Sequence, residues 1–394
     1  MRVLITTSTG LGHVLPMVPL AQALRDRGHD VLWATGPDAQ PWVRGAGLRA
    51  ITAGLNRSDA RHELQQRHPE LRTMPGEEIP DLVFPKMFGG ICAPAMFADL
   101  LPLAKDWSPR LVVHDAAELA GPVIAAALGV PSVTKSFGAL TARHRVAAAS
   151  DEVASLWRSV GLQPPPYAGC YEQLYLDVYP PGMQPPLPQY VGRSQPMRPV
   201  AYDLPEGAKG SRGSGTKPDG IPPAHGFEDR PLVYLTMGTV FSDPPALRRI
   251  VNRLASLEIR LLVTVGPAGN PDDMGDQPPN VRIERYVAQT LVLPLCQAVI
   301  SHGGSGTMLQ TLSLGLPQLC LPHAADQFMN AGAIAASGAG LALVPTEADS
   351  ESIGAAALRL LDEPSFRECA MRQGQEIALM PGPEDVAAVL EGLT

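Results

Sequence analysis

The chain has 394 residues, of which 45% are apolar and 18% charged. This length predicts two or three domains, because single hydrophobic cores rarely grow past roughly 250–300 residues. With 31 Lys and Arg against 39 Asp and Glu, the formal net charge is −8. An acidic chain is a poor candidate for binding nucleic acid by neutralising phosphates, so no nucleic-acid partner is expected.

Cysteine spacing and apolar runs bear on the compartment. The five cysteines are scattered and none forms a CxxC pair, which predicts neither a disulfide framework nor a zinc site. Reduced thiols favour a cytoplasmic protein. No apolar run approaches the roughly 18 residues of a membrane span, so none is expected. The apolar residues 3–5 lead directly into polar ones and predict a buried strand rather than a signal peptide.

In the first half of the chain, strand and helix patterns alternate. Strands are expected at 2–7, 30–35, 48–53, 110–114 and 132–135, and helices at 16–27, 38–46 and 118–128. Such alternation predicts an α/β fold with a doubly wound parallel sheet. Residues 55–106 show no clear period, and the proline-rich region 164–205 is expected to be irregular.

A second alternating set follows a break in composition. Residues 206–229 begin with a run of Gly, Ser, Pro and charge that predicts a mobile linker or loop. Beyond it, strands are expected at 232–237, 260–265, 281–286, 298–301, 318–321 and 340–344. Helices are expected at 245–256, 290–296, 307–314, 327–337 and 350–361. The sequence therefore predicts two α/β halves.

The stretch Ser-His-Gly-Gly-Ser-Gly-Thr at 301–307 lies between a predicted strand and a predicted helix. Unpaired backbone N–H groups and the helix dipole favour an anion at such a turn, and glycines let the backbone approach phosphate oxygens. Asp326 and Gln327 follow the next strand, where they could grip hydroxyl groups. A diphosphate beside hydroxyl groups describes a nucleotide sugar. The alternative is a tight turn without a ligand.

The turn after the first strand carries a histidine. Thr-Gly-Leu-Gly-His at 9–13 resembles a dinucleotide fingerprint, but Leu15 occupies the third glycine position, which disfavours a dehydrogenase. Ligands of open α/β sheets bind beyond the carboxyl ends of the strands. His13 is placed to face that edge, and histidine side chains change charge near neutral pH, which suits a general base. The alternative role is a helix cap.

Asp115 ends the predicted fourth strand. In a sheet of order 3-2-1-4, this strand lies beside the first, so Asp115 and His13 should meet. The carboxylate would orient the imidazole and stabilise its charged form. A helix cap is the alternative for Asp115. His114 points to the opposite face and is expected to be structural.

Three further features lie at strand ends or in loops of the second half. Gly238 and Thr239 end one strand and could reach the same diphosphate. Tyr286 ends another and could stack on a base, whose edge the backbone of Val287 would read; core packing is the alternative. The acidic residues Asp272, Asp273 and Asp276 are interpreted as a solvated loop rather than a metal site.

Taken in order, these motifs resemble those of the inverting GT-B glycosyltransferases of glycosyltransferase family 1. The resemblance is strongest to bacterial enzymes that attach deoxysugars to macrolides, enediynes and aromatic polyketides. It implies two Rossmann-like domains facing a cleft, with acceptor binding at 1–205, nucleotide-sugar binding at 230–379, and a C-terminal helix within 380–394 crossing back to the first domain. Tyr286 departs from the tryptophan common in the family, and Ala288 from a common proline.

The resemblance also implies roles. His13 and Asp115 would activate an acceptor hydroxyl, and no metal or other cofactor would be required. The donor would be bound by Gly238, Thr239, Tyr286, Val287, His302, Gly303, Gly304, Ser305, Gly306, Thr307, Asp326 and Gln327. A large apolar acceptor would contact Gly12, Met74, Phe84, Met87, Phe88 and Phe137, although core packing suits these apolar side chains equally well.

Several alternatives remain. A retaining glycosyltransferase or a pyridoxal-phosphate phosphorylase needs a lysine in the second half, and none follows Lys217. An epimerase would need acidic residues in the cleft that cannot be identified. A non-catalytic nucleotide-sugar-binding or activator protein is the other rival. A thymidine diphosphate (dTDP) sugar is favoured over a uridine diphosphate (UDP) sugar as donor. A homodimer is compatible with the sequence.

Overall fold

The computed structural model describes residues 1–203, 229–238, 244–266 and 269–394. These residues form two compact units. Unit 1 comprises residues 1–179, 184–202 and 380–394, and unit 2 comprises residues 180–183 and 203–379. Most of the predicted linker, residues 206–228, and the candidate Thr239 lie outside the described residues.

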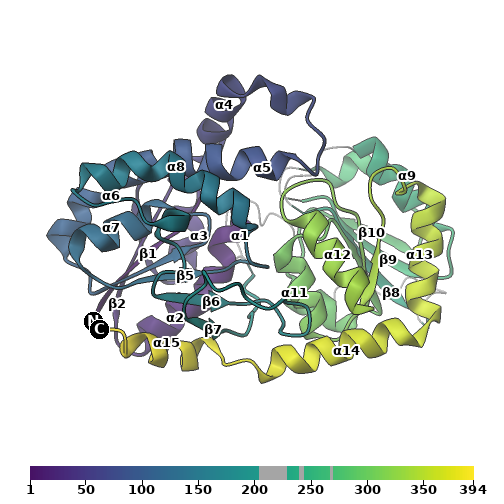
Figure 1. Ribbon diagram of the computed structural model, residues 1–394. Helices are drawn as coiled ribbons and strands as arrows, with labels where there is room; N and C mark the ends of the chain where they lie inside the picture. The colour runs from purple at the N-terminus through teal and green to yellow at the C-terminus, as the bar shows by residue number, and fades with distance from the viewer. Residues whose placement is uncertain (204–228, 239–243, 267–268) are drawn as a thin grey trace. The chain divides into compact units, whose positions relative to one another are not determined.

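Unit 1 is built on a parallel sheet of order β3-β2-β1-β4-β5-β6-β7 (Figure 1). The order confirms the expectation that the fourth strand lies beside the first, with Ile5 of β1 in register with Val113 of β4. Its strands are β1 (Arg2–Thr6), β2 (Asp30–Thr35), β3 (Arg49–Thr52), β4 (Leu111–Asp115), β5 (Ser132–Lys135), β6 (Leu174–Asp177) and β7 (Ser194–Pro196). Buried, mainly apolar runs make the strands β1, β2 and β4, as is typical of parallel sheets.

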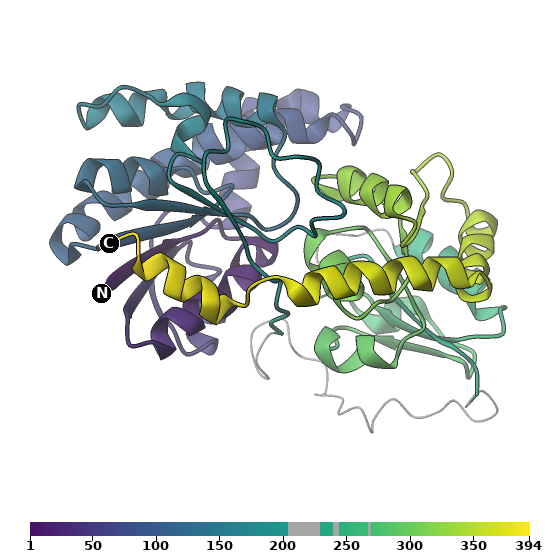
Figure 2. The ribbon, with the colours of Figure 1, turned by 60° about the horizontal axis from the view of Figure 1, so that its bottom comes forward.

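Helices cover both faces of this sheet. They are α1 (Leu11–Val14), η1 (Leu15–Met17), α2 (Val18–Asp26), α3 (Gln40–Gly45), α4 (Arg57–Arg67), η2 (Pro69–Arg72), α5 (Ile79–Val83), η3 (Phe84–Cys92), α6 (Ala93–Trp107), α7 (Ala120–Leu128), α8 (Arg143–Ser159), η4 (Pro166–Gly169) and α15 (Pro383–Glu391). The last helix, α15, packs on α2, and Figure 2 shows the two chain ends side by side. Glu391 of α15 accepts hydrogen bonds from Arg27 and His29.

Unit 2 contains a second parallel sheet, of order β10-β9-β8-β11-β12-β13. Its strands are β8 (Leu232–Thr236), β9 (Arg260–Thr264), β10 (Val281–Glu284), β11 (Ala298–Ser301), β12 (Gln318–Cys320) and β13 (Gly340–Ala342). Its helices are α9 (Pro244–Ala255), η6 (Pro271–Met274), α10 (Gln289–Val292), η7 (Leu293–Leu295), α11 (Ser305–Ser313), α12 (Gln327–Ser337), α13 (Ser350–Asp362) and α14 (Pro364–Leu379). Helices α9 and α13 pack together over one sheet face, and α11 packs on α14.

The structure differs from the sequence-based expectation in several segments. Residues 55–106 are mainly helical, although their periodicity is unclear, because prolines interrupt the pattern and the helices contact neighbours on several sides. Helices α8 and α14 were not anticipated. The strands β6 and β7 lie in a region that was expected to be irregular. The expected helix at 16–27 begins earlier, at Leu11, in three short pieces.

One helical run contradicts the expectation that no apolar stretch reaches the length of a membrane span. The run Ile79–Trp107 is long and apolar enough by length and composition, with a mean hydropathy of 1.5 in its most apolar window. Within unit 1 this run packs against α7 and α8, and 33% of its most apolar window is buried. A single helix of this kind is weak evidence for a membrane span.

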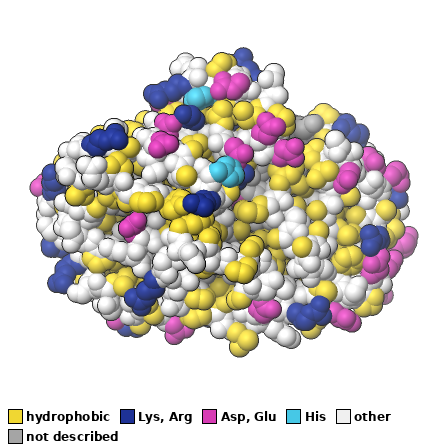
Figure 3. Space-filling model, viewed as in Figure 1, with side chains coloured by type: hydrophobic (Ala, Val, Ile, Leu, Met, Phe, Trp, Pro, Cys, Tyr) yellow, Lys and Arg dark blue, Asp and Glu magenta, His cyan; other side chains and the backbone are white. Residues whose placement is uncertain are grey.

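The face seen in Figure 3 carries charged side chains of both signs. Lys and Arg are scattered there rather than gathered into one basic patch. This distribution agrees with the negative net charge and gives that face no electrostatic footprint for nucleic acid.

Candidate active site

The adjacency of β1 and β4 brings a histidine and an aspartate together at the carboxyl edge of the sheet in unit 1. His13 lies in α1, just after β1, and Asp115 is the last residue of β4. The Nδ1 atom of His13 lies 3.2 Å from Oδ1 of Asp115. The histidine side chain is 18% exposed and the aspartate side chain 2%. The pair is therefore anchored in the core on the aspartate side and open to solvent on the histidine side.

Backbone donors hold the Asp115 carboxylate in place. The N–H of Ser8 donates to Oδ2 at 2.7 Å, and that of Ala117 donates to Oδ1 at 2.7 Å. Burial alone would raise the pKa of Asp115, but the attraction of His13 and these hydrogen bonds lower the pKa below its ordinary value. An ionised Asp115 can only accept, so the contact requires a proton on Nδ1 of His13. Nε2 is then the basic nitrogen.

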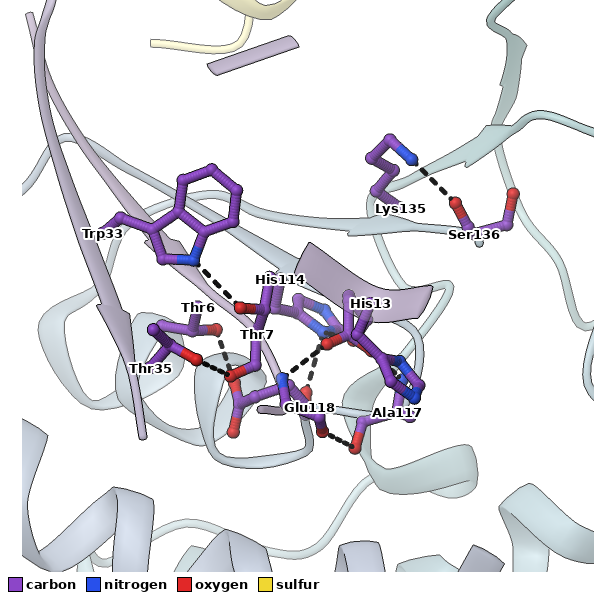
Figure 4. A network of polar contacts seen from close by, with 12 residues as sticks. Thr6, Thr7, His13, Trp33, Thr35, His114, Ala117, Glu118, Lys135 and Ser136 are labelled. Carbon is purple, nitrogen blue, oxygen red and sulfur yellow. Dashed lines mark hydrogen bonds and ion pairs between the residues drawn. The ribbon is translucent and has the colours of Figure 1, made fainter. Parts of the chain in front are cut away.

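A buried polar network lies under this pair (Figure 4). His114, fully buried, contacts the carbonyl oxygens of Asp115 and Glu118 through Nδ1, both at 3.0 Å, and its Nε2 lies 2.9 Å from Thr134 Oγ1. Burial lowers the pKa of His114 to about 4. These contacts are those of the structural histidine that the strand pattern predicts.

Glu118 is a buried acid that the sequence analysis did not single out. Its carboxyl group accepts from the N–H groups of Ala120 and Gly121 at 2.8 and 2.9 Å, and Thr6 Oγ1 donates to it. Burial raises the pKa of Glu118 to about 7. Only the buried setting distinguishes Glu118 from a surface acid, and the sequence carries no local signal of that burial.

Lys135, at the end of β5, is likewise buried. It is the register partner of Asp115 on the neighbouring strand. Its Nζ donates to the carbonyl oxygen of Ser136 at 2.9 Å, and burial lowers the pKa of Lys135 to about 7. Figure 4 shows this side chain directed away from His13, so Lys135 holds the backbone rather than the imidazole.

In unit 2, the Ser-His-Gly-Gly-Ser-Gly-Thr stretch joins β11 to α11 as the pattern predicts. Gly303 has φ +77°, in the left-handed region that favours glycine. The ring of His302 lies against two glycines. A β-carbon at Gly238 would come within 2.5 Å of His302 Cε1, and one at Gly304 within 2.4 Å of His302 Nε2. Both positions must therefore stay small for the imidazole to keep its place.

His302 supplies a buried polar atom without a protein partner. Among the described residues, its Nδ1 atom is buried and makes no hydrogen bond. Burial lowers the pKa of His302, and the nearby Asp326 opposes that effect. The backbone of residues 303–307 begins the nine-residue helix α11, whose dipole favours negative charge at its start. An oxyanion bound here would satisfy the imidazole and the helix terminus together.

Asp326, a candidate for binding sugar hydroxyl groups, belongs to a second hydrogen-bond network. Ser305 Oγ donates to Asp326 Oδ2 at 2.5 Å, and the Nδ2 group of Asn330 lies 3.0 Å from the same oxygen. Asn330 Nδ2 also lies 2.9 Å from the carbonyl oxygen of Gly303 and 3.0 Å from Ser305 Oγ. Asn330, fully buried, was not predicted, yet it ties the glycine turn to the start of α12.

Asp326 and Gln327 each use a side-chain oxygen for contacts within the protein. Asp326 accepts through Oδ2 within this network. Gln327 Oε1 accepts from the N–H groups of His323 and Ala324 at 2.8 and 3.0 Å, which leaves its amide nitrogen as a donor. Ala325, just before them, has φ +57°, a strained value of the kind that clusters at ligand sites.

The turn after β10 is fixed at both ends. Asp203 accepts from the N–H groups of Gln289 and Thr290 at 2.9 and 3.2 Å, which caps α10. Gln289 Nε2 donates to Thr307 Oγ1 at 3.2 Å, so this turn is tied to the glycine turn. Val287 is buried in an apolar cluster, which leaves only its backbone for a ligand, and Tyr286 is partly buried.

The acceptor candidates fall into different environments. Phe84 is buried in the core cluster of unit 1, and Met87 packs on a satellite cluster with Ile91. Met74 lies in a bend after η2 and Gly12 is exposed in α1. Phe88 and Phe137 contact the imidazole of His13, with ring centroids 5.6 and 4.7 Å away. Of the acceptor candidates, the structure thus places Phe88 and Phe137 in contact with His13.

No cluster of three or more His, Cys, Asp or Glu that could hold a metal occurs within residues 1–203, 229–238, 244–266 and 269–394. The acidic residues Asp272 and Asp273 lie exposed on η6, and Asp276 is also exposed. The residues present at the glycine turn are nitrogen and hydroxyl donors, which suit an anion rather than a cation.

Two α/β units, each built on a parallel sheet, are typical of GT-B glycosyltransferases. Comparison with known proteins agrees with this architecture. Models described as erythromycin biosynthesis protein CIII-like, N-terminal and C-terminal domains, match residues 22–205 and 248–393. L-demethylnoviosyl transferase of Streptomyces niveus is 35% identical over 409 residues, covering 100% of this chain and 97% of its own. The elloramycin glycosyltransferase ElmGT of Streptomyces olivaceus is 34% identical over 401 residues, covering 99% and 97%.

A solved structure extends the comparison to the fold. The glycosyltransferase VinC, in complex with dTDP, matches with a TM-score of 0.80 at 27% identity, covering 100% of this chain and 99% of that one. The chain belongs to the erythromycin biosynthesis protein CIII-like family of natural-product glycosyltransferases. It transfers a sugar, and the expectations of the GT-B fold and of this family are confirmed.

Proposed function

We propose that this enzyme moves a deoxysugar from a dTDP-linked donor to a hydroxyl group of an apolar natural-product acceptor, with inversion at the anomeric carbon. Unit 1 would supply the base and unit 2 the donor site. The observation that carries the proposal is the contact of 3.2 Å between His13 and a buried, backbone-held Asp115. A histidine oriented by a carboxylate is the arrangement that activates a hydroxyl nucleophile.

The reaction would proceed in one displacement. Nε2 of His13 takes the proton of the acceptor hydroxyl as its oxygen forms a bond to the anomeric carbon. The bond from that carbon to the diphosphate oxygen breaks on the opposite face, and dTDP leaves with the electron pair. Asp115 stabilises the imidazolium formed on His13. Because attack and departure occur on opposite faces, the anomeric configuration inverts.

The leaving diphosphate would be stabilised in unit 2. His302, whose buried Nδ1 atom has no partner among the described residues, and the start of α11 would offer donors and a positive field to its oxygens. Asp326 and Gln327 would hold sugar hydroxyls through Oδ1 and the amide nitrogen. Preorganised donors of this kind do the work that a divalent cation does elsewhere, so we propose a metal-independent reaction.

The choice of nucleotide and acceptor rests on the relatives. VinC was solved with dTDP, the elloramycin glycosyltransferase is named after a natural product, and L-demethylnoviosyl transferase is named after the group that it transfers. The five cysteines are free, two of them partly exposed, which suits a reducing compartment such as the cytoplasm.

Calorimetry of the full chain with dTDP and UDP, in buffer containing EDTA, tests the donor site. The proposal predicts that dTDP binds at least tenfold more tightly than UDP, without a metal. Transfer from dTDP-α-D-glucose to a panel of phenolic and macrolactone aglycones should give a β-glucoside by NMR. Absence of dTDP binding, a need for a divalent cation, or an α-linked product would each contradict the proposal.

A further inference from the structure

The contact with Asp115 does not by itself fix the imidazole of His13. A single hydrogen bond of 3.2 Å lies at the long end of the usual range and contributes only modestly to orientation. The ring could still turn about its bond to the β-carbon. The proton-accepting nitrogen would then swing away from a bound hydroxyl, and misplacement by about 1 Å can cost roughly 10²-fold in rate.

Two aromatic rings meet this imidazole edge to face. Phe137 lies with its centroid 4.7 Å from that of His13 and an interplanar angle of 68°. Phe88 lies 5.6 Å away at 62°. The backbone of Gly10 closes in as well, since a β-carbon there would lie 3.0 Å from His13 Cδ2. Contacts of this geometry are favourable and directional.

Phe137 is held by the backbone that precedes it. The N–H of Ser136 donates to the carbonyl oxygen of Leu176 at 2.9 Å, and its hydroxyl oxygen accepts from the N–H of Val178 at 3.0 Å. The buried Lys135 donates to the carbonyl oxygen of Ser136, the peptide group that leads into Phe137. These three hydrogen bonds, one of them from the buried lysine, fix the turn from which the ring of Phe137 projects.

Phe88 is held by an unusual helix. It lies in η3, a nine-residue π-helix, a form that occurs often at functional sites. Gly89 and Gly90 let η3 pack closely on α8, because β-carbons there would lie 3.0 and 2.8 Å from Glu152 atoms. Lys86 of η3 pairs with Glu152 at 2.5 Å. The π-helix is thereby fixed to α8 with Phe88 turned toward His13.

We propose that Phe88 and Phe137 are positioning residues for His13, holding the imidazole so that Nδ1 stays on Asp115 and Nε2 stays on the acceptor hydroxyl. This role rests on the proposed function and differs from that of a wall of the acceptor pocket. A wall residue changes the acceptor KM. A positioning residue changes kcat and the state of the imidazole, whether or not an acceptor is bound.

The test is nitrogen NMR of the full chain labelled with [15N]histidine, with His13 assigned through a His13→Gln variant. Wild type should show one fixed tautomer, with the proton on Nδ1. Phe137→Leu and Phe88→Leu should each show a mixture of tautomers. Phe97→Leu is the matched control, because Phe97 packs on the same cluster without a ring contact to His13, and it should keep the fixed tautomer.

Kinetics with the acceptor found in the panel give a second readout. Phe137→Leu should lower kcat by about tenfold to 10²-fold with little change in the acceptor KM, and Phe137→Tyr should restore most of the loss. A fixed tautomer in both leucine variants, or a raised KM at unchanged kcat, overturns the proposal. If wild type itself shows mixed tautomers, the His13–Asp115 pair of the proposed function fails first.

Discussion

His13 Nδ1 and Asp115 Oδ1 lie 3.2 Å apart although 102 positions separate the two residues in the chain. Parallel pairing of β1 with β4 brings them together, because both residues lie at the carboxyl edge of the sheet, Asp115 at the end of β4 and His13 just after β1. Asp115 is also gripped by the backbone of Ser8 and Ala117. The fold thus places the aspartate, whose carboxylate provides one of the contacts that orient the histidine.

Asp115→Asn should lower kcat by about 10²–10⁴-fold, because an amide cannot stabilise the imidazolium or enforce the Nδ1–H tautomer. Affinity for dTDP should be unchanged, since the donor residues belong to unit 2. Asp177→Asn is the matched control. Asp177 also ends a strand of this sheet and accepts a backbone N–H, from Tyr179 at 3.0 Å, but makes no hydrogen bond to any histidine that the structure describes. Equal loss of activity in both variants would contradict the orienting role.

Glu118 should make stability depend on pH. Its folded-state pKa of about 7 lies above the ordinary value of 4.5, so the folded protein keeps a proton that the unfolded chain has lost in this interval. The free energy of unfolding should therefore fall as pH rises from about 4.5 to about 7, by roughly 3 kcal/mol at most. Denaturant unfolding across this range should show a steeper fall in wild type than in Glu118→Gln, which lacks the contribution of this carboxyl group.

The difference between the pH–stability profiles of wild type and Glu118→Gln isolates the contribution of Glu118. His114, whose pKa burial lowers to about 4, and Asp177, whose pKa burial raises to about 6, titrate in both proteins. The glutamine variant should be less stable at low pH, because its amide cannot accept from Ala120, Gly121 and Thr6 as the carboxyl group does. Parallel profiles for the two proteins would show that Glu118 is not protonated in the fold.

Gly304→Ala should weaken dTDP binding by roughly tenfold to 10²-fold. Its backbone conformation suits any residue, with φ −66°, so strain is not the cause. The added carbon would lie 2.4 Å from His302 Nε2 and push the imidazole out of place. Calorimetry with dTDP measures the loss. Gly332→Ala is the control, because nothing lies within 4 Å of its added carbon; equal affinities for the two variants would argue against His302 as a ligand.

Asn330→Asp should weaken binding of dTDP-glucose by at least tenfold. The change replaces a donor by a carboxylate oxygen facing Gly303 O, Ser305 Oγ and Asp326 Oδ2. It should also destabilise unit 2 by about 1–3 kcal/mol. Asn280→Asp separates the two effects, because buried Asn280 donates to Ala255 O and Ile259 O within unit 2 but makes no contact with the glycine turn. That control should lose stability and keep donor affinity.

The pairing of the first strand with the fourth, and the meeting of His13 with Asp115, could be predicted from sequence because the polar residues lie at strand ends. Alternating apolar runs and glycine stops placed β1, β4 and β11, and parallel pairing then dictated which ends meet. His13 and Asp115 follow from that rule alone. The same rule placed the glycine turn at the start of α11.

Other parts of the site depend on packing that no local pattern reports. The region containing η3 has prolines and no clear period, so its helices and the approach of Phe88 to His13 could not be foreseen. Asn330 lies on a helix whose sequence looks ordinary, and only burial against the glycine turn gives it a role. Asp203 caps α10 from 86 positions away, a distance over which sequence gives no pairing signal.

In the proposed mechanism, His13 is the base and unit 2 binds the donor independently of it. The most direct measurement compares wild type with His13→Ala in two assays on the same preparations: calorimetry with dTDP in EDTA, and single-turnover transfer from a dTDP-sugar. We expect the variant to bind dTDP with an affinity within about twofold of wild type and to transfer the sugar about 10²–10⁴-fold more slowly. Transfer by the variant at close to the wild-type rate would contradict this mechanism.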